Sequence, residues 1–479
     1  MTDAQAAATV QFGRLERRGL LLGLSVAQTA ALSVVLVVVV AAEYVAGVVG
    51  VLVAAPLWAI PAAAALVQVA GRPVLSWLPV VTHWGVRRAL AQHRYLVRPS
   101  RVTASQLELP GIRARLAVID GPKTGAALVH DRSESTITAI LSVSGSGFLL
   151  AEPGSQDHRV AGWGRLLAGL CQQPAVVRVQ VLARCVLGGA APVRRWWAEH
   201  ALTNAPWAAR VLAELVADAE QVSDRHETFL ALAIRTPKPG QRGGSSASLA
   251  VVERQLTAVA EAARAADLDV HGWITSRRLP VLLRATYDPQ GAARADTGSL
   301  SEEGPPPVLV GPAGVQEAWA SIRTDSSHHA VYWVVEWPRS AVHAGFLQPL
   351  LLAPGAHRAL SLTAQPLPPG VALREIRRAR VEHAADSAQR ARIGQLEDEA
   401  TRAEVADVVR REQELVAGHG DLRLVGLLTV SAPTLVELDA ACAATESAAA
   451  QAMCEIRRLV GQQGQAFTAA AVPLARRVS

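Results

Sequence analysis

The hydrophobic pattern is dominated by a region near the start of the chain in which almost every position is apolar. Residues 19–42 and 45–70 form two apolar segments that only Glu43 and Tyr44 separate. A helix rises about 1.5 Å per residue and needs about 20 residues to cross a hydrocarbon core of about 30 Å. Two such segments joined by a short polar turn predict a helical hairpin at residues 19–71 that crosses a membrane and returns.

Arginines flank this region on both sides, whereas the turn between its segments contains one acidic residue and no basic one. Under the positive-inside rule, this distribution predicts a multi-pass membrane protein with both termini in the cytoplasm. A signal peptide is one alternative, but it would have a shorter apolar core before a cleavage site. A buried soluble hairpin is another, but such a hairpin is rarely apolar on every face over this length.

Residues 72–100, which follow the hairpin, contain two tryptophans seven positions apart and a cluster of arginines. Tryptophan favours the headgroup region of a membrane, so we predict an interfacial helix and linker here. An amphipathic helix packed on the soluble part of the chain is the alternative. The predicted membrane-interface residues are Arg14, Arg17, Arg18, Arg72, Trp77, Trp84, Arg87 and Arg88.

From residue 137 the pattern changes to alternating strands and helices. The order strand, helix, strand, long helix, strand, helix, strand occurs twice, the first time from residue 137 and the second time from residue 329 to a last strand at 465–472. Alternation of this kind predicts βαβ-type units with mixed sheets. The predicted fold is therefore α+β (mixed α/β), with a cytoplasmic lead (1–18), the hairpin (19–71), the interfacial segment (72–100), a first cytoplasmic lobe (101–289), a linker rich in Gly, Pro and Ser (290–314) and a second lobe (315–479).

Residues 372–417 form a long helical stretch that ends at Gly418, a usual stop residue. A continuous helix of this length would reach roughly 70 Å, and a fold back near Gly394 is the alternative. Acidic residues occur among the arginines of this stretch. Because the opposite charges largely cancel, a solvated or partner-facing helix fits better than a DNA-binding one.

Composition restricts the chemistry further. The 479 residues carry a net charge of +6, part of which is the arginine cluster that would face anionic lipid headgroups, so direct binding of nucleic acid is not predicted. The four cysteines lack the spacing of a zinc site, and each lies in an apolar pattern. Free, buried thiols in a reducing cytoplasm are the expectation.

No phosphate-binding loop, nucleophile elbow or HExxH motif occurs in the sequence. The pair His328–His329 could serve a metal or an acid–base reaction, although a solvent-exposed strand end is the commoner explanation. We therefore predict a protein that is not an enzyme and has no cofactor and no metal site. A catalytic triad that assembles in space would leave no linear motif.

Several stretches, spread over nearly the whole chain, resemble one family. They are Arg159-Val-Ala-Gly-Trp-Gly164, Leu166-Leu-Ala168, Tyr332-Trp-Val-Val-Glu-Trp-Pro338, Phe346-Leu-Gln-Pro-Leu-Leu-Leu352, Arg410-Arg-Glu-Gln-Glu-Leu-Val-Ala-Gly-His419 and the segment around Phe467. The family is a poorly characterised actinobacterial group of membrane proteins associated with conjugation and type IV-like secretion. In layout it is similar to a PrgI-like membrane hairpin followed by the N-terminal region of VirB-four-type ATPases, without their motor domain.

The resemblance implies a structural component of a secretion complex that anchors and docks a separate secretion ATPase and other subunits at the cytoplasmic face. By analogy with secretion rings, a homo- or hetero-oligomer is expected. Two alternatives remain: an EccE-like component of type VII secretion, and a membrane-bound enzyme that acts on a substrate at the lipid interface.

Overall fold

The structure is a computed structural model. It describes residues 9–10, 12, 26–69, 72–97, 106–112, 116–145, 147–187, 197, 199–201, 206–219, 224–236, 245–294, 310–352, 357–392 and 399–478. The chain divides into two compact units. Unit 1 comprises Met1–Arg14, Arg94–Leu459 and Gln463–Ser479, and unit 2 comprises Leu15–His93 and Val460–Gln462.

Within its described residues, unit 2 consists of helices and one short strand pair. Its elements are α1 (Val26–Val53), α2 (Ala55–Leu66), β2 (Gln68–Val69), β3 (Arg72–Pro73), η1 (Val74–Trp77) and α3 (Leu78–Ala89).

Unit 1 mixes strands and helices. Its strands are β1 (Thr9–Val10), β4 (Arg94–Leu96), β5 (Gln106–Leu107), β6 (Leu116–Asp120), β7 (Ala127–Asp131), β8 (Thr136–Ser144), β9 (Val176–Leu187), β10 (Asp224–Arg235), β11 (Asp269–Trp273), β12 (Gly314–Glu317), β13 (Ile322–Arg323), β14 (His328–Glu336), β15 (Val342–His343), β16 (His357–Leu367), β17 (Asp421–Ala432) and β18 (Glu455–Arg458). Its helices are η3 (Phe148–Leu150), α4 (Pro153–Cys171), α6 (Pro206–Ala219), α7 (Ser245–Ala265), α8 (Arg278–Tyr287), α9 (Pro289–Arg294), α10 (Gln348–Leu351), α11 (Pro369–Arg392), α12 (Glu399–Val416), α13 (Leu435–Gln451) and α14 (Gln463–Ala471).

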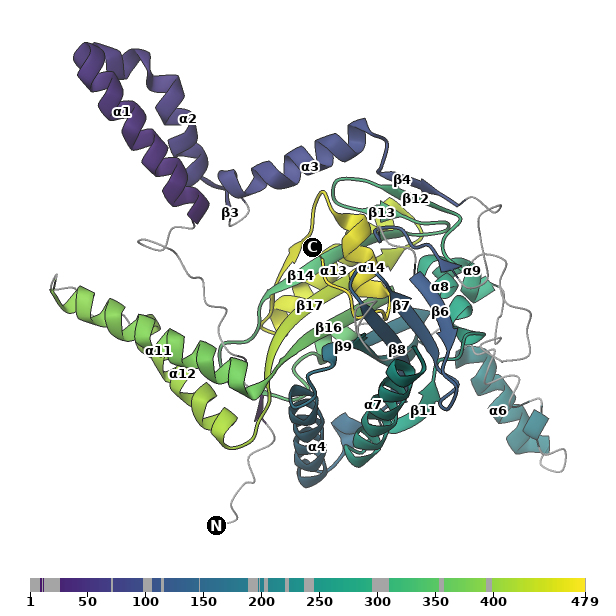
Figure 1. Ribbon diagram of the computed structural model, residues 1–479. Helices are drawn as coiled ribbons and strands as arrows, with labels where there is room; N and C mark the ends of the chain where they lie inside the picture. Colours follow the sequence, from purple (N-terminus) through teal and green to yellow (C-terminus); the bar gives the residue numbers. More distant parts are fainter. Residues whose placement is uncertain are drawn as a thin grey trace. The chain divides into compact units, whose positions relative to one another are not determined.

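One large sheet runs through unit 1 (Figure 1). Its 14 strands follow the order β4-β12-β13-β14-β17-β16-β9-β10-β8-β7-β6-β5, with β11 beside β8 and β18 beside β14. The pairings along it are antiparallel. The structure therefore differs from the predicted pair of lobes with mixed sheets, because β9 and β16 join both halves into one sheet. The strands that α4 connects, β8 and β9, are not adjacent, because β10 lies between them and pairs antiparallel with both.

The two halves of the sheet repeat one arrangement. The first half has the order β11-β8-β10-β9, and the second has the order β18-β14-β17-β16. In each half the fourth strand lies beside the first, followed by the third and then the second. This is the split βαβ, or ferredoxin-like, arrangement. The repeated order of elements that the sequence predicted is thus present, as two copies that meet at β9 and β16.

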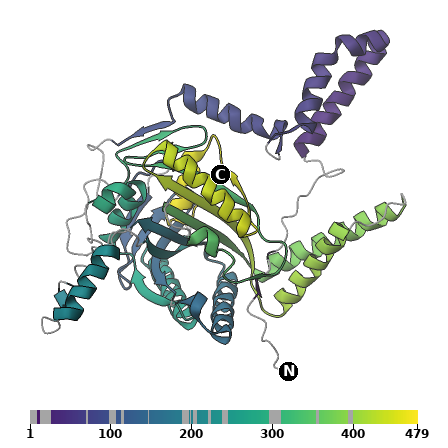
Figure 2. The same cartoon turned by 180° about the vertical axis from the view of Figure 1, so that it is seen from behind.

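Side chains alternate between the two faces of the sheet, and each face has its own core. On one face, α4 and α7 lie side by side over the first half, while α10 and α13 cover the second (Figures 1 and 2). On the other face, α8 and α14 meet over the centre of the sheet, where the rings of Tyr287 and Phe467 lie 5.3 Å apart. These two helices each follow the last strand of their half, so they too are equivalent elements of the repeat.

Three predicted elements differ in the structure. The last segment, expected as a strand, is helix α14, and eight of its nine residues are buried, so it shows no amphipathic period. The helix after Thr434 ends at Gln451 and is followed by strand β18. The long stretch at 372–417 is two helices, α11 and α12, joined by the ion pair of Arg380 and Glu412 at 2.6 Å. It folds back because it connects the antiparallel neighbours β16 and β17. Gly394, where the fold back was predicted, lies outside the described residues. Most of the predicted linker at 290–314 also lies outside them.

Candidate functional site

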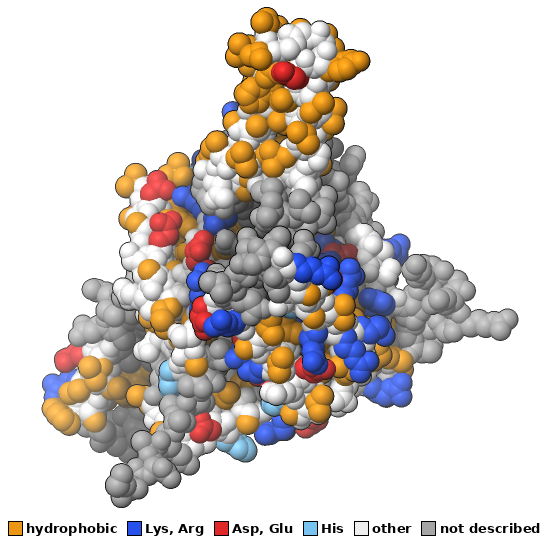
Figure 3. All heavy atoms as spheres, turned by 90° about the vertical axis from the view of Figure 1, so that its left-hand side faces the viewer, with side chains coloured by type: hydrophobic (Ala, Val, Ile, Leu, Met, Phe, Trp, Pro, Cys, Tyr) orange, Lys and Arg blue, Asp and Glu red, His pale blue; other side chains and the backbone are white. Residues whose placement is uncertain are grey.

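The apolar helices of unit 2 are the clearest candidate for a functional element. The helix at Ala27–Val53 is long and apolar enough to cross a membrane, with a mean hydropathy of 2.5 in its most apolar window, none of which is buried. A helix in a soluble core would be mostly buried, so this explanation fits poorly. On the face seen in Figure 3, hydrophobic side chains cover these helices.

Helices α1 and α2 pack against each other in opposite directions. The side chain of Gln28, near the start of α1, donates its Nε2 hydrogen to the carbonyl oxygen of Ala65, near the end of α2, at 2.8 Å. The backbone leaves helical geometry at Ala46 and Gly47, a few residues after the predicted turn. Gly47 has φ +58°, a conformation that glycine adopts without strain, so backbone freedom rather than side-chain polarity places this break.

The predicted membrane-interface residues that the structure describes cluster between β3 and the end of α3. Arg72 begins β3, and Trp77 ends η1 and donates from Nε1 to the carbonyl oxygen of Val69 at 3.2 Å. Arg87 and Arg88 occupy the last turn of α3, where a positive charge interacts favourably with the helix dipole. Trp84 is only 8% exposed, so in this structure Trp77 is the tryptophan of the pair that keeps more contact with solvent. Arg14, Arg17 and Arg18 lie outside the described residues.

The segment before the apolar helices pairs with the sheet-bearing unit, which the sequence analysis did not predict. Strand β1 pairs antiparallel with β15, Thr9 opposite His343 and Val10 opposite Val342. Phe12 then stacks on Trp337 with ring centroids 4.9 Å apart. A second aromatic ring, that of Phe346, approaches Phe12 edge-on at 5.5 Å. Lone aromatic residues far apart in sequence carry no signal of such a contact.

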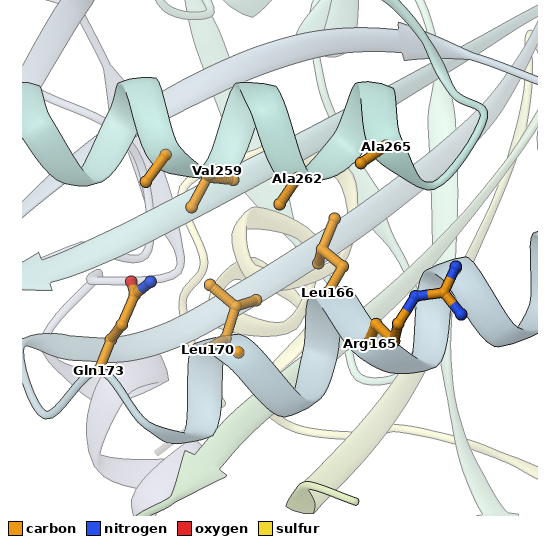
Figure 4. Close-up of a pocket in the computed structure, with 10 residues that line it drawn as sticks. Arg165, Leu166, Leu170, Gln173, Val259, Ala262 and Ala265 are labelled. Carbon is orange, nitrogen blue, oxygen red and sulfur yellow. The ribbon is translucent and has the colours of Figure 1, made fainter.

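Unit 1 contains a polar cavity of about 240 Å³, called here the β11 cavity. It is lined by Ser142, Val143, Ser144, Arg184, His226, Glu227, Thr228, Phe229, His271, Ile274, Arg278 and Leu282. These residues come from β8, β9, β10, β11, the position after β11 (Ile274) and α8, and no linear motif connects them. A second, largely apolar groove of about 150 Å³ lies between α4 and α7, where Val259 and Ala262 point toward Leu166 and Leu170 (Figure 4).

The histidine pair, His328–His329, lies at the start of β14. His329 is fully buried, contrary to the predicted solvent-exposed strand end, and its ring lies between the hydroxyls of Thr324 (2.7 Å) and Ser431 (2.6 Å). Burial, with repulsion from His357 and His328, lowers the pKa of His329 to about 3. Within the described ranges, no three side chains of His, Cys, Asp or Glu come together as metal ligands do. All four cysteines are free and buried, as predicted.

Comparison with models of known protein families gave no match to this chain, and comparison with curated proteins gave none either.

Proposed function

We propose that the chain is an integral membrane component of a conjugation-like secretion machine, which anchors and docks a separate ATPase at the cytoplasmic face and catalyses no reaction itself. In this proposal α1 and α2 cross the membrane as a hairpin. The arm from the break at Gly47 to Leu66 has roughly 19 residues and reaches about 28 Å, close to the thickness of a hydrocarbon core.

The pairing of β1 with β15 is the observation that supports a hairpin best. β1 precedes the apolar helices in the chain, and β15 follows them. The two strands pair with each other, and the ring of Phe12, just after β1, stacks on Trp337. Because both contacts hold the start of the chain against the part that follows the apolar helices, both flanks of the apolar region belong on the same side of a membrane. A chain that starts and ends on one side crosses an even number of times, so a single crossing does not fit this pairing.

The α11–α12 pair supports the docking part of the proposal. It extends away from the sheet (Figures 1 and 2) and exposes apolar side chains, Val381 by 70% and Val416 by 80%. Its own core is small, formed by Ile376, Ala379 and Val408. An exposed apolar surface on a projecting element is typical of a protein–protein contact. The family resemblance suggests the ATPase as the partner.

Co-purification from solubilised membranes tests the docking. We expect a conjugation-type secretion ATPase to be retained by the wild type and to be lost with Val381→Asp and Val416→Asp. The matched control is Val436→Asp on α13, because Val436 is also 80% exposed but lies elsewhere in unit 1. Equal retention by all three variants, or no retention by the wild type, contradicts the proposal. Retention of a type VII secretion ATPase would instead assign the chain to that machine.

A further inference from the structure

The β11 cavity brings charged and polar side chains from distant parts of the chain to one face of the sheet. Ser142 pairs with Phe229, and Arg184 pairs with Glu227, so the register directs these side chains to the face that α8 covers. On β11 the register shifts between Val270 and Gly272, opposite β8. At this irregularity the ring of His271 meets the hydroxyl of Ser144, with 2.8 Å between Nε2 and Oγ.

Two of the charges in the cavity neutralise each other. Arg184 and Glu227 form an ion pair through two guanidinium nitrogens, at 2.7 Å from Nε and 2.5 Å from NH2, and their side chains are only 8% and 11% exposed. Arg184 also donates to the hydroxyl of Thr286 at 3.0 Å and lies over the ring of Phe229. Each guanidinium nitrogen of Arg184 therefore has a partner, and the carboxylate of Glu227 does not repel an anion strongly.

Arg278 is different, because it begins α8 at the cavity with an incomplete set of partners. Its Nε is buried and has no hydrogen-bond partner in the described part of the chain. Nor does an ion pair join it to an acidic side chain within those ranges. A buried guanidinium donor without an acceptor is unfavourable unless a ligand or water supplies one. This arginine leaves the cavity with an excess of positive charge.

We propose that the β11 cavity binds a small oxyanion, with Arg278 as its main charged ligand and Ser142, Ser144 and His271 as further donors. Phosphate is the best fit, because its four oxygens can accept hydrogen bonds from several elements at once, and a guanidinium matches its geometry. The amides of α8 contribute little. Those of Arg278 and Leu279 already bond to Thr275, and Pro280 has none. His271 is exposed, so the cavity opens to solvent beside it.

The lone Ser144–His271 pair does not by itself indicate catalysis. A serine nucleophile needs a base that a third group orients, and the carboxylate in this cavity, Glu227, is bound to Arg184. Hydroxyl and imidazole groups beside an arginine are also ordinary ligands of an anion. The site lies within unit 1, and its occupancy is independent of the membrane anchor and of ATPase docking.

The test is a titration of the detergent-solubilised full chain with inorganic phosphate. Calorimetry measures the affinity, and the midpoint of thermal unfolding reports stabilisation by the bound ion. Arg278→Gln is expected to weaken phosphate binding at least about tenfold, which corresponds to about 1.4 kcal/mol. Arg278→Lys keeps the charge and should retain part of the affinity. The matched control is Arg277→Gln, because Arg277 is exposed, adjacent in sequence and not part of the cavity lining.

A parallel titration with a short-chain, soluble phosphatidic acid separates a free phosphate from a lipid headgroup as the source. Binding of either compound that Arg278→Gln weakens and Arg277→Gln does not supports the site and identifies the source. Absence of binding by both compounds, or equal affinity in the wild type and Arg278→Gln, overturns the proposal. If Arg278→Gln unfolds without ligand at a much lower temperature, Ser142→Ala provides the decisive comparison in its place.

Discussion

At the scale of single residues, buried polar side chains connect the two halves of the sheet. Gln180, on β9, donates to Ser361 on β16 at 2.8 Å and accepts from the backbone amide of Ala475 at 2.7 Å. His329 on β14 bonds two hydroxyls and packs on the ring of Phe467, with centroids 4.4 Å apart. Satisfied networks of this kind specify a single packing, whereas an unmatched group in them is costly. The bond from Gln180 to Ser361 links β9 to β16, where the two halves meet, whereas the contacts of His329 lie within the second half.

His329 makes the stability of unit 1 depend on pH. Its pKa is about 3 in the folded chain, mainly because of burial, and about 6.5 in the unfolded chain. Between these values the unfolded state binds a proton that the folded state does not, so stability falls as the pH falls below about 6.5. The slope is at most about 1.4 kcal/mol per pH unit. We expect His329→Gln to flatten the decline of the thermal unfolding midpoint between neutral and mildly acidic pH.

His328→Gln is the control for this measurement. The pKa of His328 is also lowered by burial, but its ring is partly exposed. A smaller change in slope is therefore expected for His328→Gln. Parallel curves for the wild type and His329→Gln would show that His329 is not the group responsible.

At the scale of elements, the end of α12 shows how local backbone chemistry and tertiary packing act together. Gly418 has φ +95°. Its backbone amide donates to the carbonyl oxygen of Leu415 at 3.2 Å, and the backbone amide of His419 donates to the carbonyl oxygen of Glu414 at 3.0 Å. These two bonds form the Schellman motif, which ends a helix at a left-handed residue. Gly420 then allows close approach to α4, because a Cβ there would lie 2.7 Å from Sγ of Cys171.

Substitution of Gly418 by alanine tests this helix end. We expect Gly418→Ala to lower the free energy of unfolding by about 1 kcal/mol, because an L side chain is strained in the left-handed region. Gly370→Ala is the matched control near the start of α11. Gly370 has no such φ, and no atom lies within 4 Å of a Cβ built there, so this change should be neutral or slightly stabilising. Equal effects in thermal unfolding would contradict the assigned role of Gly418.

At the scale of the whole molecule, the proposed function depends on the topology of the chain in the membrane. A hairpin that crosses and returns places Tyr44, near its break and 92% exposed, on the side of the membrane opposite unit 1. The native cysteines suit a labelling experiment, since all four are buried. Burial also raises the pKa of the Cys171, Cys442 and Cys454 thiols, and the thiolate is the reactive form.

In intact cells, a membrane-impermeant maleimide should label Tyr44→Cys directly. It should label Lys123→Cys, at an exposed position of unit 1, only after permeabilisation. The wild type measures the background from the native thiols. Protection of Tyr44→Cys in intact cells, with labelling after permeabilisation, would contradict a crossing hairpin while leaving a membrane-surface attachment. Labelling of Lys123→Cys in intact cells would reverse the proposed orientation.

Much of the fold follows from signals that are local in the sequence. The capping box of Thr434 and Glu437 begins α13, and both of its partners lie within one helical turn, so this signal is local in the sequence. Strand β14 (His328–Glu336) is found where the second repeat was predicted to start, at residue 329. Strands β6 and β7 were not predicted, because they are short. The candidate sites were less predictable: Arg278, His271 and Ser144 lie in separate segments, and only the shift in register on β11 brings two of them into contact.

The sequence by itself determined the apolar region near the N-terminus, its flanking arginines, the repeated order of strands and helices and the free state of the cysteines. Each of these depends on neighbouring residues or on composition. Only the tertiary structure decided that β9 pairs with β16, that β1 pairs with β15, that α14 is a helix and that the β11 cavity exists. Strand pairing and burial on all sides depend on contacts between distant residues, and a hydrophobic period specifies a face without specifying its partner.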